Sequence, residues 1–328
     1  MSSFDVELKK FVANLVIVSI TSSIAKTITA PMDRIKLILQ NQDSALQVIK
    51  GERVKYKGIL DCFLRFPKEQ GLWSFWRGNG TNILRYFPTQ ALNFAFNDFY
   101  KKIFQKVIGD DTPSKSVLIR FLAGGLAGTC ATSLMFPLEF CQTRIAVDIG
   151  ASCSKEKKGK IVKREFQGLR DCIRKVKKVD GMRGLYCGYP VAVLGISLYR
   201  ALYFGLFDSF KHLWPKEDMN KQPVKLPMFL GLVLAQSVTC ISGICTYPLD
   251  TVARRLMLDS GRPKELRLFS SSWGAFKTLY KAEGFFTFYR GAMTNCVRGM
   301  SGALVLVFYD EVLHYTKWKD WLSPCDNC

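Results

Sequence analysis

The sequence has few of the residues that form metal sites. It contains two histidines, His212 and His314, and its eleven cysteines are mostly scattered singly through apolar stretches. Only Cys325 and Cys328 have the Cys-x-x-Cys spacing. Structural zinc needs four closely spaced Cys or His ligands, so we expect no metal site and no cofactor. The scatter is also unlike the disulfide framework of a small secreted protein, and we expect free thiols.

Motifs for nucleotide hydrolysis are missing as well. The sequence has no Gly-x-x-x-x-Gly-Lys-[Ser/Thr] run and no cluster of acids that would hold a metal, so we expect no enzyme. The first ten residues lack the short apolar core and cleavage site of a removable signal. Any targeting information is therefore expected to be internal.

The charge is unbalanced toward basic residues. Lys and Arg number 47 against 27 Asp and Glu, for a net charge of +20, while 48% of the residues are hydrophobic. A basic soluble protein would suggest nucleic-acid binding, but its apolar runs would be confined to a core. Here the apolar runs are too many and too long. We expect a membrane protein with no nucleic-acid partner.

One pattern occurs three times at a period of roughly a hundred residues, which is typical of repeat architectures. Each copy begins with Pro-x-acid at the end of an apolar stretch and ends with aromatic-x-Gly before a second apolar stretch. The first elements are Pro31-Met32-Asp33, Pro137-Leu138-Glu139 and Pro248-Leu249-Asp250, and the last are Trp76-Arg77-Gly78, Tyr186-Cys187-Gly188 and Tyr289-Arg290-Gly291. Between them lie Tyr56-Lys57-Gly58, Phe166-Gln167-Gly168 and the weaker Phe269-Ser270-Ser271. We expect one domain over residues 1–328, with repeats at 8–106, 114–213 and 224–318 and a tail at 319–328.

Each repeat offers two apolar segments of about twenty residues or more, the length that crosses a bilayer as a helix. The six predicted spans cover residues 10–40, 80–105, 116–147, 188–212, 226–258 and 291–316. Small residues at four-residue spacing, such as Gly124 and Gly128, allow helices to approach closely. The sequence thus predicts an all-α membrane protein. Buried helices of a soluble protein are the alternative, which three near-equal repeats with paired spans disfavour.

Basic residues lie inside the predicted spans, where charges are costly. Lys26, Arg85, Arg200 and Arg298 sit among apolar neighbours, and no Asp or Glu lies at comparable depth. A charge within the membrane usually faces a water-filled path. Extension of the side chain to the interface would account for one or two of them. Four bases without acids predict an electropositive cavity for a multiply charged anion.

The acids lie at the ends of the spans, in two repeating sets. On the first, third and fifth spans, the acid after proline is followed three residues later by Lys36, Gln142 and Ala253; on the others, Asp98, Asp208 and Asp310 are followed by Lys101, Lys211 and Leu313. Three-residue spacing puts both members on one helix face. We expect two rings of ion pairs, one at each mouth of the cavity, that act as gates.

These motifs resemble the mitochondrial carrier family, whose repeated motif is Pro-x-[Asp/Glu]-x-x-[Lys/Arg]. The resemblance extends from residue 10 to 316. Within the family the sequence is most similar to the ADP/ATP carriers, because the run from Arg85 to Phe96 (RYFPTQALNFAF) matches their second span almost completely. Further matches are Ala25-Lys26-Thr27, Gly195-Ile196, Tyr199-Arg200 and Arg298-Gly299-Met300.

The resemblance implies a fold and an activity. It implies a monomeric, barrel-like bundle of six transmembrane helices in three pseudosymmetric repeats, with short helices on the matrix side. It places this bundle in the mitochondrial inner membrane, with cardiolipin bound between repeats. The implied activity is exchange of ADP for ATP by alternating access.

The resemblance also implies roles for single residues. Lys26, Arg85 and Arg298 would bind the phosphates, and Gly195, Ile196 and Tyr199 would hold the adenine, with Asn93 and Arg200 nearby. Gln40 would brace the matrix gate, which is formed by Asp33, Lys36, Glu139, Gln142, Asp250 and Ala253.

The sequence departs from the ADP/ATP carriers at their hexapeptide of three arginines and three methionines. That segment reads Ala253-Arg254-Arg255-Leu256-Met257-Leu258 here. We expect Ala253 to leave Glu139 without its ionic partner and Gln142 to offer Asp33 only a neutral hydrogen bond. In the matrix ring the pair of Lys36 and Asp250 would survive, and Leu313 removes a base from the cytoplasmic ring. Weakened rings predict altered turnover or a biased resting state.

Two alternative functions stay open at this stage. The altered hexapeptide is compatible with a carrier of another adenine nucleotide or of a phosphorylated cofactor. The missing gate residues are also compatible with a degenerate carrier that regulates without transporting, although the intact binding residues argue against it.

Overall fold

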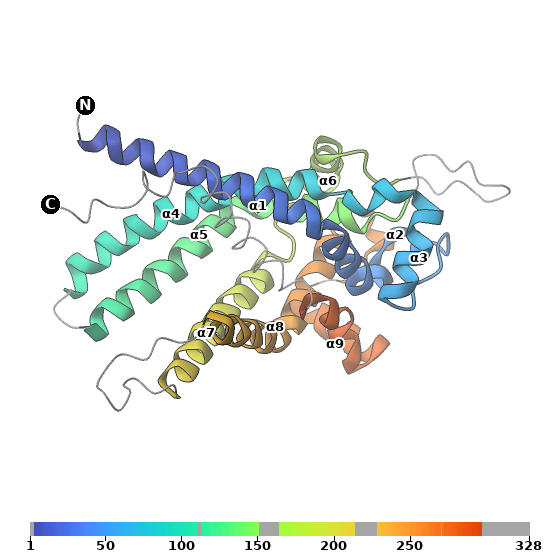
Figure 1. Ribbon diagram of the computed structural model, residues 1–328. Coiled ribbons are helices and arrows are strands. Elements are labelled where there is room, and N and C mark those ends of the chain that lie inside the picture. Colours follow the sequence, from blue (N-terminus) through green and yellow to red (C-terminus); the bar gives the residue numbers. More distant parts are fainter. Residues whose placement is uncertain (1–2, 110–112, 151–163, 214–227, 270, 297–328) are drawn as a thin grey trace.

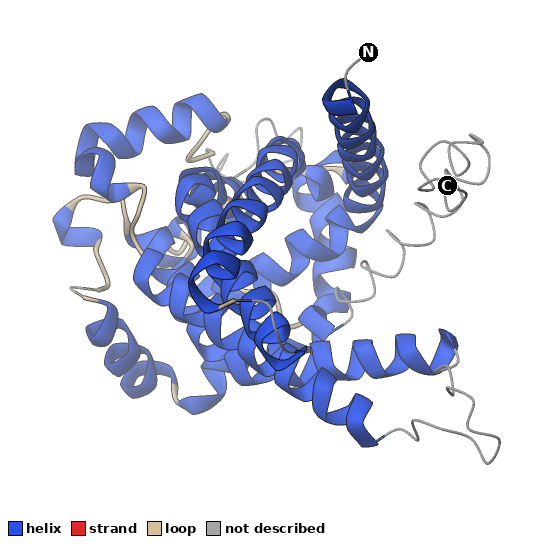
Figure 2. Ribbon diagram, turned by 90° about the vertical axis from the view of Figure 1, so that its left-hand side faces the viewer, coloured by secondary structure: helices blue, strands red, loops and turns tan. Residues whose placement is uncertain are grey.

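The computed structural model describes residues 3–109, 113–150, 164–213, 228–269 and 271–296. These residues form α-helices, short 3-10 helices and the turns between them, and no strand occurs among them (Figure 2). Five long helices coincide with the first five predicted spans: α1 (Ser3–Asn41), α4 (Asn79–Ile108), α5 (Pro113–Val147), α7 (Tyr189–Leu213) and α8 (Met228–Asp259). Of the sixth predicted span, residues 291–296 are described.

Short helices lie together at one end of the long ones (Figure 1). They are α2 (Leu46–Ile49), α3 (Ile59–Gln70), α6 (Leu169–Gly184) and α9 (Ser272–Glu283), with 3-10 turns η1 (Gln42–Ser44), η2 (Leu72–Trp76), η3 (Lys264–Leu266) and η4 (Phe285–Tyr289). Repeat 1 therefore runs α1, α3, α4, and repeat 2 runs α5, α6, α7. Repeat 3 begins in the same order with α8 and α9. We call the end that carries the short helices the matrix end, following the family resemblance.

Hydropathy alone would not have found all five of the predicted spans that the structure describes. Among the described residues, one helical segment, Leu118–Val147, is long and apolar enough to cross a membrane. The helix α6 and residues 189–203 pass the same test only as a pair bent by 72°. The helices α1 and α8 instead carry ion-paired and hydrogen-bonded residues in their matrix-end halves. The prediction of six spans depends on the repeat pattern, because polar interior faces lower the hydropathy of a carrier helix.

Eleven residues after each motif proline, a polar side chain forms hydrogen bonds with the backbone of the loop that follows the long helix. Gln42 accepts a hydrogen bond from Tyr56 N at 2.7 Å and donates one to Tyr56 O at 3.1 Å. Asp148 accepts from the backbone N of Glu165 and Phe166, and Asp259 accepts from that of Leu268 and Phe269. In each repeat, the aromatic residue of the middle motif (Tyr56, Phe166 or Phe269) is thus hydrogen-bonded to a side chain at or just after the end of the first long helix. Buried backbone N–H groups need such acceptors.

Buried arginines connect each repeat to the next. Arg34 donates to the carbonyls of Ala146 and Asp148, at 3.0 and 3.2 Å, and so joins repeat 1 to repeat 2. Arg144 donates to the carbonyls of Met257 and Leu258, at 3.1 and 2.8 Å, and joins repeat 2 to repeat 3. Their side chains are almost fully buried, so these bonds are shielded from water.

A third buried arginine connects repeat 3 back to repeat 1. Arg255 contacts Glu283 within repeat 3 at 2.7 Å and Asp43 of repeat 1 at 3.3 Å. Of the hexapeptide residues, Arg255 thus has a structural position, while Leu256 and Leu258 lie in the apolar core of the matrix end.

The glycine of the aromatic-x-Gly motif in repeat 2, Gly188, lies at the contact between repeats 2 and 3. Gly188 has a φ of 86°, a conformation that L side chains rarely adopt. A Cβ atom there would lie 2.6 Å from the carbonyl oxygen of Ala253. Gly78 and Gly291 share the positive φ. The repeated aromatic-x-Gly motif therefore marks a turn that packs closely on the next long helix.

Candidate functional site

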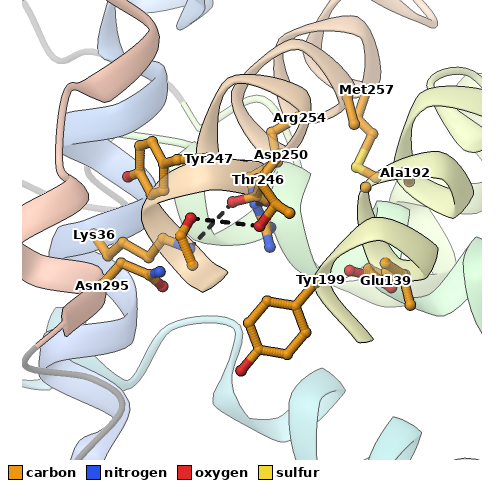
Figure 3. Close-up of a pocket in the computed structure, with 14 residues that line it drawn as sticks. Lys36, Glu139, Ala192, Tyr199, Thr246, Tyr247, Asp250, Arg254, Met257 and Asn295 are labelled. Atoms are coloured by element: carbon orange, nitrogen blue, oxygen red, sulfur yellow. Dashed lines mark hydrogen bonds and ion pairs between the residues drawn. The ribbon is translucent and has the colours of Figure 1, made fainter. Parts of the chain in front are cut away.

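A cavity of about 230 Å³ lies among the long helices near their matrix end, lined by residues of α1, α5, α7, α8 and the segment after η4 (Figure 3). Its lining combines ionisable residues with the predicted adenine site: Lys36, Glu139, Asp250 and Arg254 on one hand, Gly195, Ile196 and Tyr199 on the other. Met257 of the hexapeptide lines it as well. The predicted matrix gate and the predicted adenine site therefore share one cavity.

The matrix end of this cavity is closed by a pair of opposite charges. Lys36 Nζ on α1 lies 3.2 Å from Asp250 Oδ2 on α8 (Figure 3). Gln40 lies one turn further along α1, and its amide donates to the same oxygen at 3.1 Å and to Thr251 Oγ1 at 3.0 Å. The resemblance to the carrier family had implied that Lys36 and Asp250 form the surviving pair of the matrix ring. Gln40 braces this contact in the structure.

Glu139, which Ala253 was expected to leave without its ionic partner, has a cation nearby. Arg85 Nη1 on α4 lies 3.9 Å from Glu139 Oε2 on α5, and Arg85 Nε donates to Gln142 Oε1 at 3.2 Å. The expectation that Glu139 would lack an ionic partner was therefore wrong for this conformation. The reason is that a long arginine side chain from the neighbouring helix reaches the position that residue 253 cannot. Asp33 lines a small pocket with Arg34, Asn79 and Gln142.

Arg254 also lies at the gate. Its Nε contacts Asp250 Oδ1 at 2.9 Å, one helical turn away, and its Nη1 donates to Thr143 Oγ1 on α5 at 3.2 Å. The four-residue spacing of Asp250 and Arg254 was a signal that sequence reasoning missed. Asp250 is thus held by two cations from two directions.

The predicted bases do not all face the cavity. Lys26 Nζ lies 5.0 Å from the ring centre of Tyr86, between α1 and α4. The guanidinium of Arg200 donates to the carbonyl of Gly124 at 2.7 Å and occupies the space beside Gly128, where any side chain would overlap it. Among the described residues, Lys36 and Arg254 line the cavity instead of Lys26, Arg85 and Arg200. Arg298 lies outside the described residues.

The prediction that all four bases converge on one pocket is therefore corrected for Lys26, Arg85 and Arg200, none of which lines this cavity. Gly128 of α5 leaves room for the guanidinium of Arg200, and the carbonyl of Gly124 accepts a hydrogen bond from it. Asn93 is half-buried on α4, away from the lining.

The cytoplasmic ring is described only in part. Asp98 and Lys101 are exposed on α4. The side chains of Asp208 and Lys211, and all of Asp310 and Leu313, lie outside the described residues.

Each junction between repeats holds a further pocket at the matrix end. Their volumes are similar, about 450 Å³ between repeats 1 and 2, 440 Å³ between repeats 2 and 3, and 550 Å³ between repeats 3 and 1. Each is lined by the aromatic-x-Gly turn of one repeat and by the start of a short helix in the next: α6 at Gly168, α9 at Ser271 and α3 at Gly58. Helix N-termini offer unpaired N–H groups to anions.

The pockets differ at the residue before the turn glycine. Arg77 and Arg290 line two of them, and Cys187 occupies the equivalent position in the pocket between repeats 2 and 3. Burial raises the pKa of the Cys187 thiol to about 11, so this side chain is neutral at physiological pH. Arg183 and Arg267 also line that pocket, together with Asp259 and with Asp180, which pairs with Arg267.

Comparison with known proteins accounts for nearly the whole chain. The family model described as "Mitochondrial carrier protein" matches residues 7–107, 113–218 and 225–320. The chain is 44% identical to human ADP/ATP translocase 4 over 297 residues, which cover 90% of this chain and 89% of that one. It is also 44% identical to ADP/ATP translocase 2 of Tachyglossus aculeatus aculeatus over 90% of this chain and 95% of the relative. The same identity holds for human ADP/ATP translocase 3, over 89% and 93%.

Proposed function

The chain belongs to the mitochondrial carrier family, and from this premise we propose that it exchanges ADP for ATP across the mitochondrial inner membrane. It is a multi-pass transporter of adenine nucleotides, not an enzyme. The observation that carries the proposal is the 44% identity to ADP/ATP translocases over nine tenths of the chain. The transport mechanism that fits the gated cavity is alternating access.

The cavity supports an adenine site. Gly195 lines the cavity, and a Cβ atom there would lie 3.3 Å from Leu249 Cβ, so the glycine lets α7 approach α8 closely. Tyr199 provides an aromatic ring beside it and stacks on Tyr203, with ring centres 6.2 Å apart. Stacking and apolar contact suit a purine. Ile196 would complete the apolar side of the site.

Phosphate groups require cations that can leave their present partners. Arg85 carries a planar fork that suits bidentate binding of phosphate oxygens, and Lys26 supplies a point charge from the neighbouring helix. Arg298 joins them in the proposal on the family resemblance alone. Asn93 and Arg200 lie on the same helices, α4 and α7, as Arg85 and the adenine site. We assign Asn93 a supporting position near the nucleotide and leave Arg200 out of the site, because its guanidinium is held by the carbonyl of Gly124.

Opening toward the matrix must separate Lys36 from Asp250. The bonds from Gln40 add to the cost of separation. A nucleotide that binds more tightly to the partly opened state than to the closed state supplies the required free energy. We infer that the substrate itself drives the transition, as an exchanger requires.

ADP and ATP should raise the unfolding temperature of the detergent-solubilised protein, because a ligand that binds only the folded state stabilises it. At a hundred times the dissociation constant, the gain is about 2.7 kcal/mol. Liposomes loaded with ADP should also take up labelled ATP. AMP and guanine nucleotides serve as matched controls and should give smaller shifts.

Other outcomes point to the alternatives. Stabilisation by a different adenine nucleotide or a phosphorylated cofactor, with none by ADP, would indicate another carrier specificity. Stabilisation by ADP without exchange would indicate a regulatory protein that has lost transport.

The pockets at the repeat junctions support bound cardiolipin. Its two phosphates match two groups that meet in each pocket, the start of a short helix and the turn before the next long helix. We propose that the protein is a monomer with cardiolipin at these junctions. Arg77 and Arg290 line two of the junctions, where they also pair with Asp148 and with Asp43, whereas the third junction has the neutral Cys187 at this position.

Cardiolipin should raise the unfolding temperature of delipidated protein more than phosphatidylglycerol does, and inorganic phosphate should have the smallest effect. The variant Cys187→Arg should increase the gain from cardiolipin, because it adds a cation to the pocket between repeats 2 and 3. Cys187→Gln is the neutral control. Equal gains for all three lipid and phosphate additions, or for both variants, would contradict the proposal.

A further inference from the structure

The gate positions of this chain have few cations, yet α5 is joined to α4 and to α8 at the gate. Positions 142 and 253 hold glutamine and alanine, so the ring predicted from the spacing after each proline keeps one of its three bases, Lys36. In the structure, two arginines from outside that ring contact α5. Arg85 comes from α4 and Arg254 from α8.

Arg85 spans the α4–α5 joint. Its guanidinium contacts Gln142 at 3.2 Å and Glu139 at 3.9 Å, and these two residues lie on one face of α5 at three-residue spacing. The side chains of Arg85 and Glu139 are each about one fifth exposed, so the charges are only partly screened by water. The contact makes use of the very carboxylate that alanine at position 253 leaves available.

Arg254 spans the α5–α8 joint. It contacts Asp250 at 2.9 Å and Thr143 at 3.2 Å, with 17% of its side chain exposed. With Lys36 on Asp250, the bonds run from α1 through α8 to α5, and Arg85 continues them to α4. Four long helices are thereby connected at one level.

We propose that Arg254 and Arg85 act as the matrix-gate cations of this chain in place of the bases absent from positions 253 and 142. The proposal rests on the proposed function in one respect, namely that Arg85 also binds phosphate. A phosphate that takes Arg85 must withdraw it from Glu139 and Gln142. Binding of a phosphorylated substrate thus loosens the α4–α5 joint directly, whereas a nucleoside without phosphates fills the adenine site and leaves that joint closed.

Arg254→Gln tests the gate without any nucleotide, by thermal unfolding of the purified protein in detergent. The variant should unfold about 1–2 °C lower, the shift that about 1 kcal/mol produces in a protein of this length. Arg254→Lys should retain more than half of the difference, because it keeps the charge. Arg120→Gln removes an exposed arginine of α5 and should leave the unfolding temperature unchanged.

The decisive comparison repeats Arg254→Gln in an Ala253→Arg background. Arginine at position 253 adds a second cation that can join α8 to α5 through Glu139, so the loss of Arg254 should cost less than half as much there. Equal losses for the Lys and Gln variants would overturn the proposal, because packing alone would then explain them. Equal losses in both backgrounds would also overturn it, because position 253 would then be unrelated to Arg254.

A double-mutant cycle tests Arg85 in the same assay. Arg85→Gln and Glu139→Gln should lower the unfolding temperature by less in combination than the sum of the single changes. Additive changes would show that the two side chains do not interact. These measurements use unliganded protein, so absence of nucleotide exchange would refute the proposed function and leave the gate proposal standing.

Discussion

Replacing Asp148 by asparagine should lower the free energy of unfolding by about 3–5 kcal/mol, because the change breaks a charge pair whose carboxylate is fully buried. Asp148 Oδ2 lies 2.6 Å from Arg77 Nη2 and accepts from the backbone of Glu165 and Phe166. Its Oδ1 accepts from Gln47 at 2.6 Å and from Gly150 at 3.2 Å. An asparagine would turn one of these acceptors into a donor that faces other donors.

Thermal unfolding in detergent measures this effect, with Asp171→Asn as the control. Asp171 lies on α6 in the same repeat, is partly exposed, and pairs with Lys175 one turn away. Its change should cost at most about 1 kcal/mol. Similar losses for the two variants would mean that the buried acid does not organise the junction between repeats 1 and 2. If Asp148→Asn yields no folded protein, Asp148→Glu keeps the charge and should recover part of the expression.

Replacing Arg85 by glutamine should reduce ADP/ATP exchange by about 10- to 100-fold, as expected for loss of one charge-assisted hydrogen bond to a phosphate. The initial rate of labelled ADP uptake into ADP-loaded liposomes measures it. Arg85→Lys should restore part of the rate, since it keeps the charge and loses the fork. Arg120→Gln should transport at the normal rate.

Thermal unfolding of the same preparations separates transport from folding. The Arg85→Gln protein should remain folded, and ADP should stabilise it less than it stabilises the unchanged protein. An exchange rate within twofold of normal would remove Arg85 from the substrate site.

The sequence was sufficient for the long helices because their signals are repeated. Each first helix of a repeat contains the motif proline and continues past it, and the small residues beside it appear at helical spacing. The gate pair of Lys36 and Asp250 was implied by the carrier-family resemblance, whereas three-residue spacing alone placed each acid and the residue after it on one helix face.

Other contacts depend on tertiary packing and could not be predicted. Gly124 and Gly128 indicated close helix approach, but their spacing does not say that Arg200 fills the space beside them. The reach of Arg85 to Glu139 depends on the neighbouring helix in the same way. Gln42, Asp148 and Asp259 did have a sequence signal, their common distance from the motif prolines. It was missed because glutamine replaces aspartate in the first repeat.

The arginine contacts between repeats have a consequence for how the chain can be divided. Arg34, Arg144 and Arg255 each donate forward, from one repeat to its successor, and the last donates to the first. Such head-to-tail interfaces are heterologous, and they terminate only when rotation brings the final copy back to the beginning. A single repeat on its own would have an arginine without its acceptor at one edge, and an acceptor without its arginine at the other edge. The three repeats thus form a closed ring like a cyclic trimer, although they belong to one polypeptide. We expect the complete ring of three repeats to be the smallest stable unit.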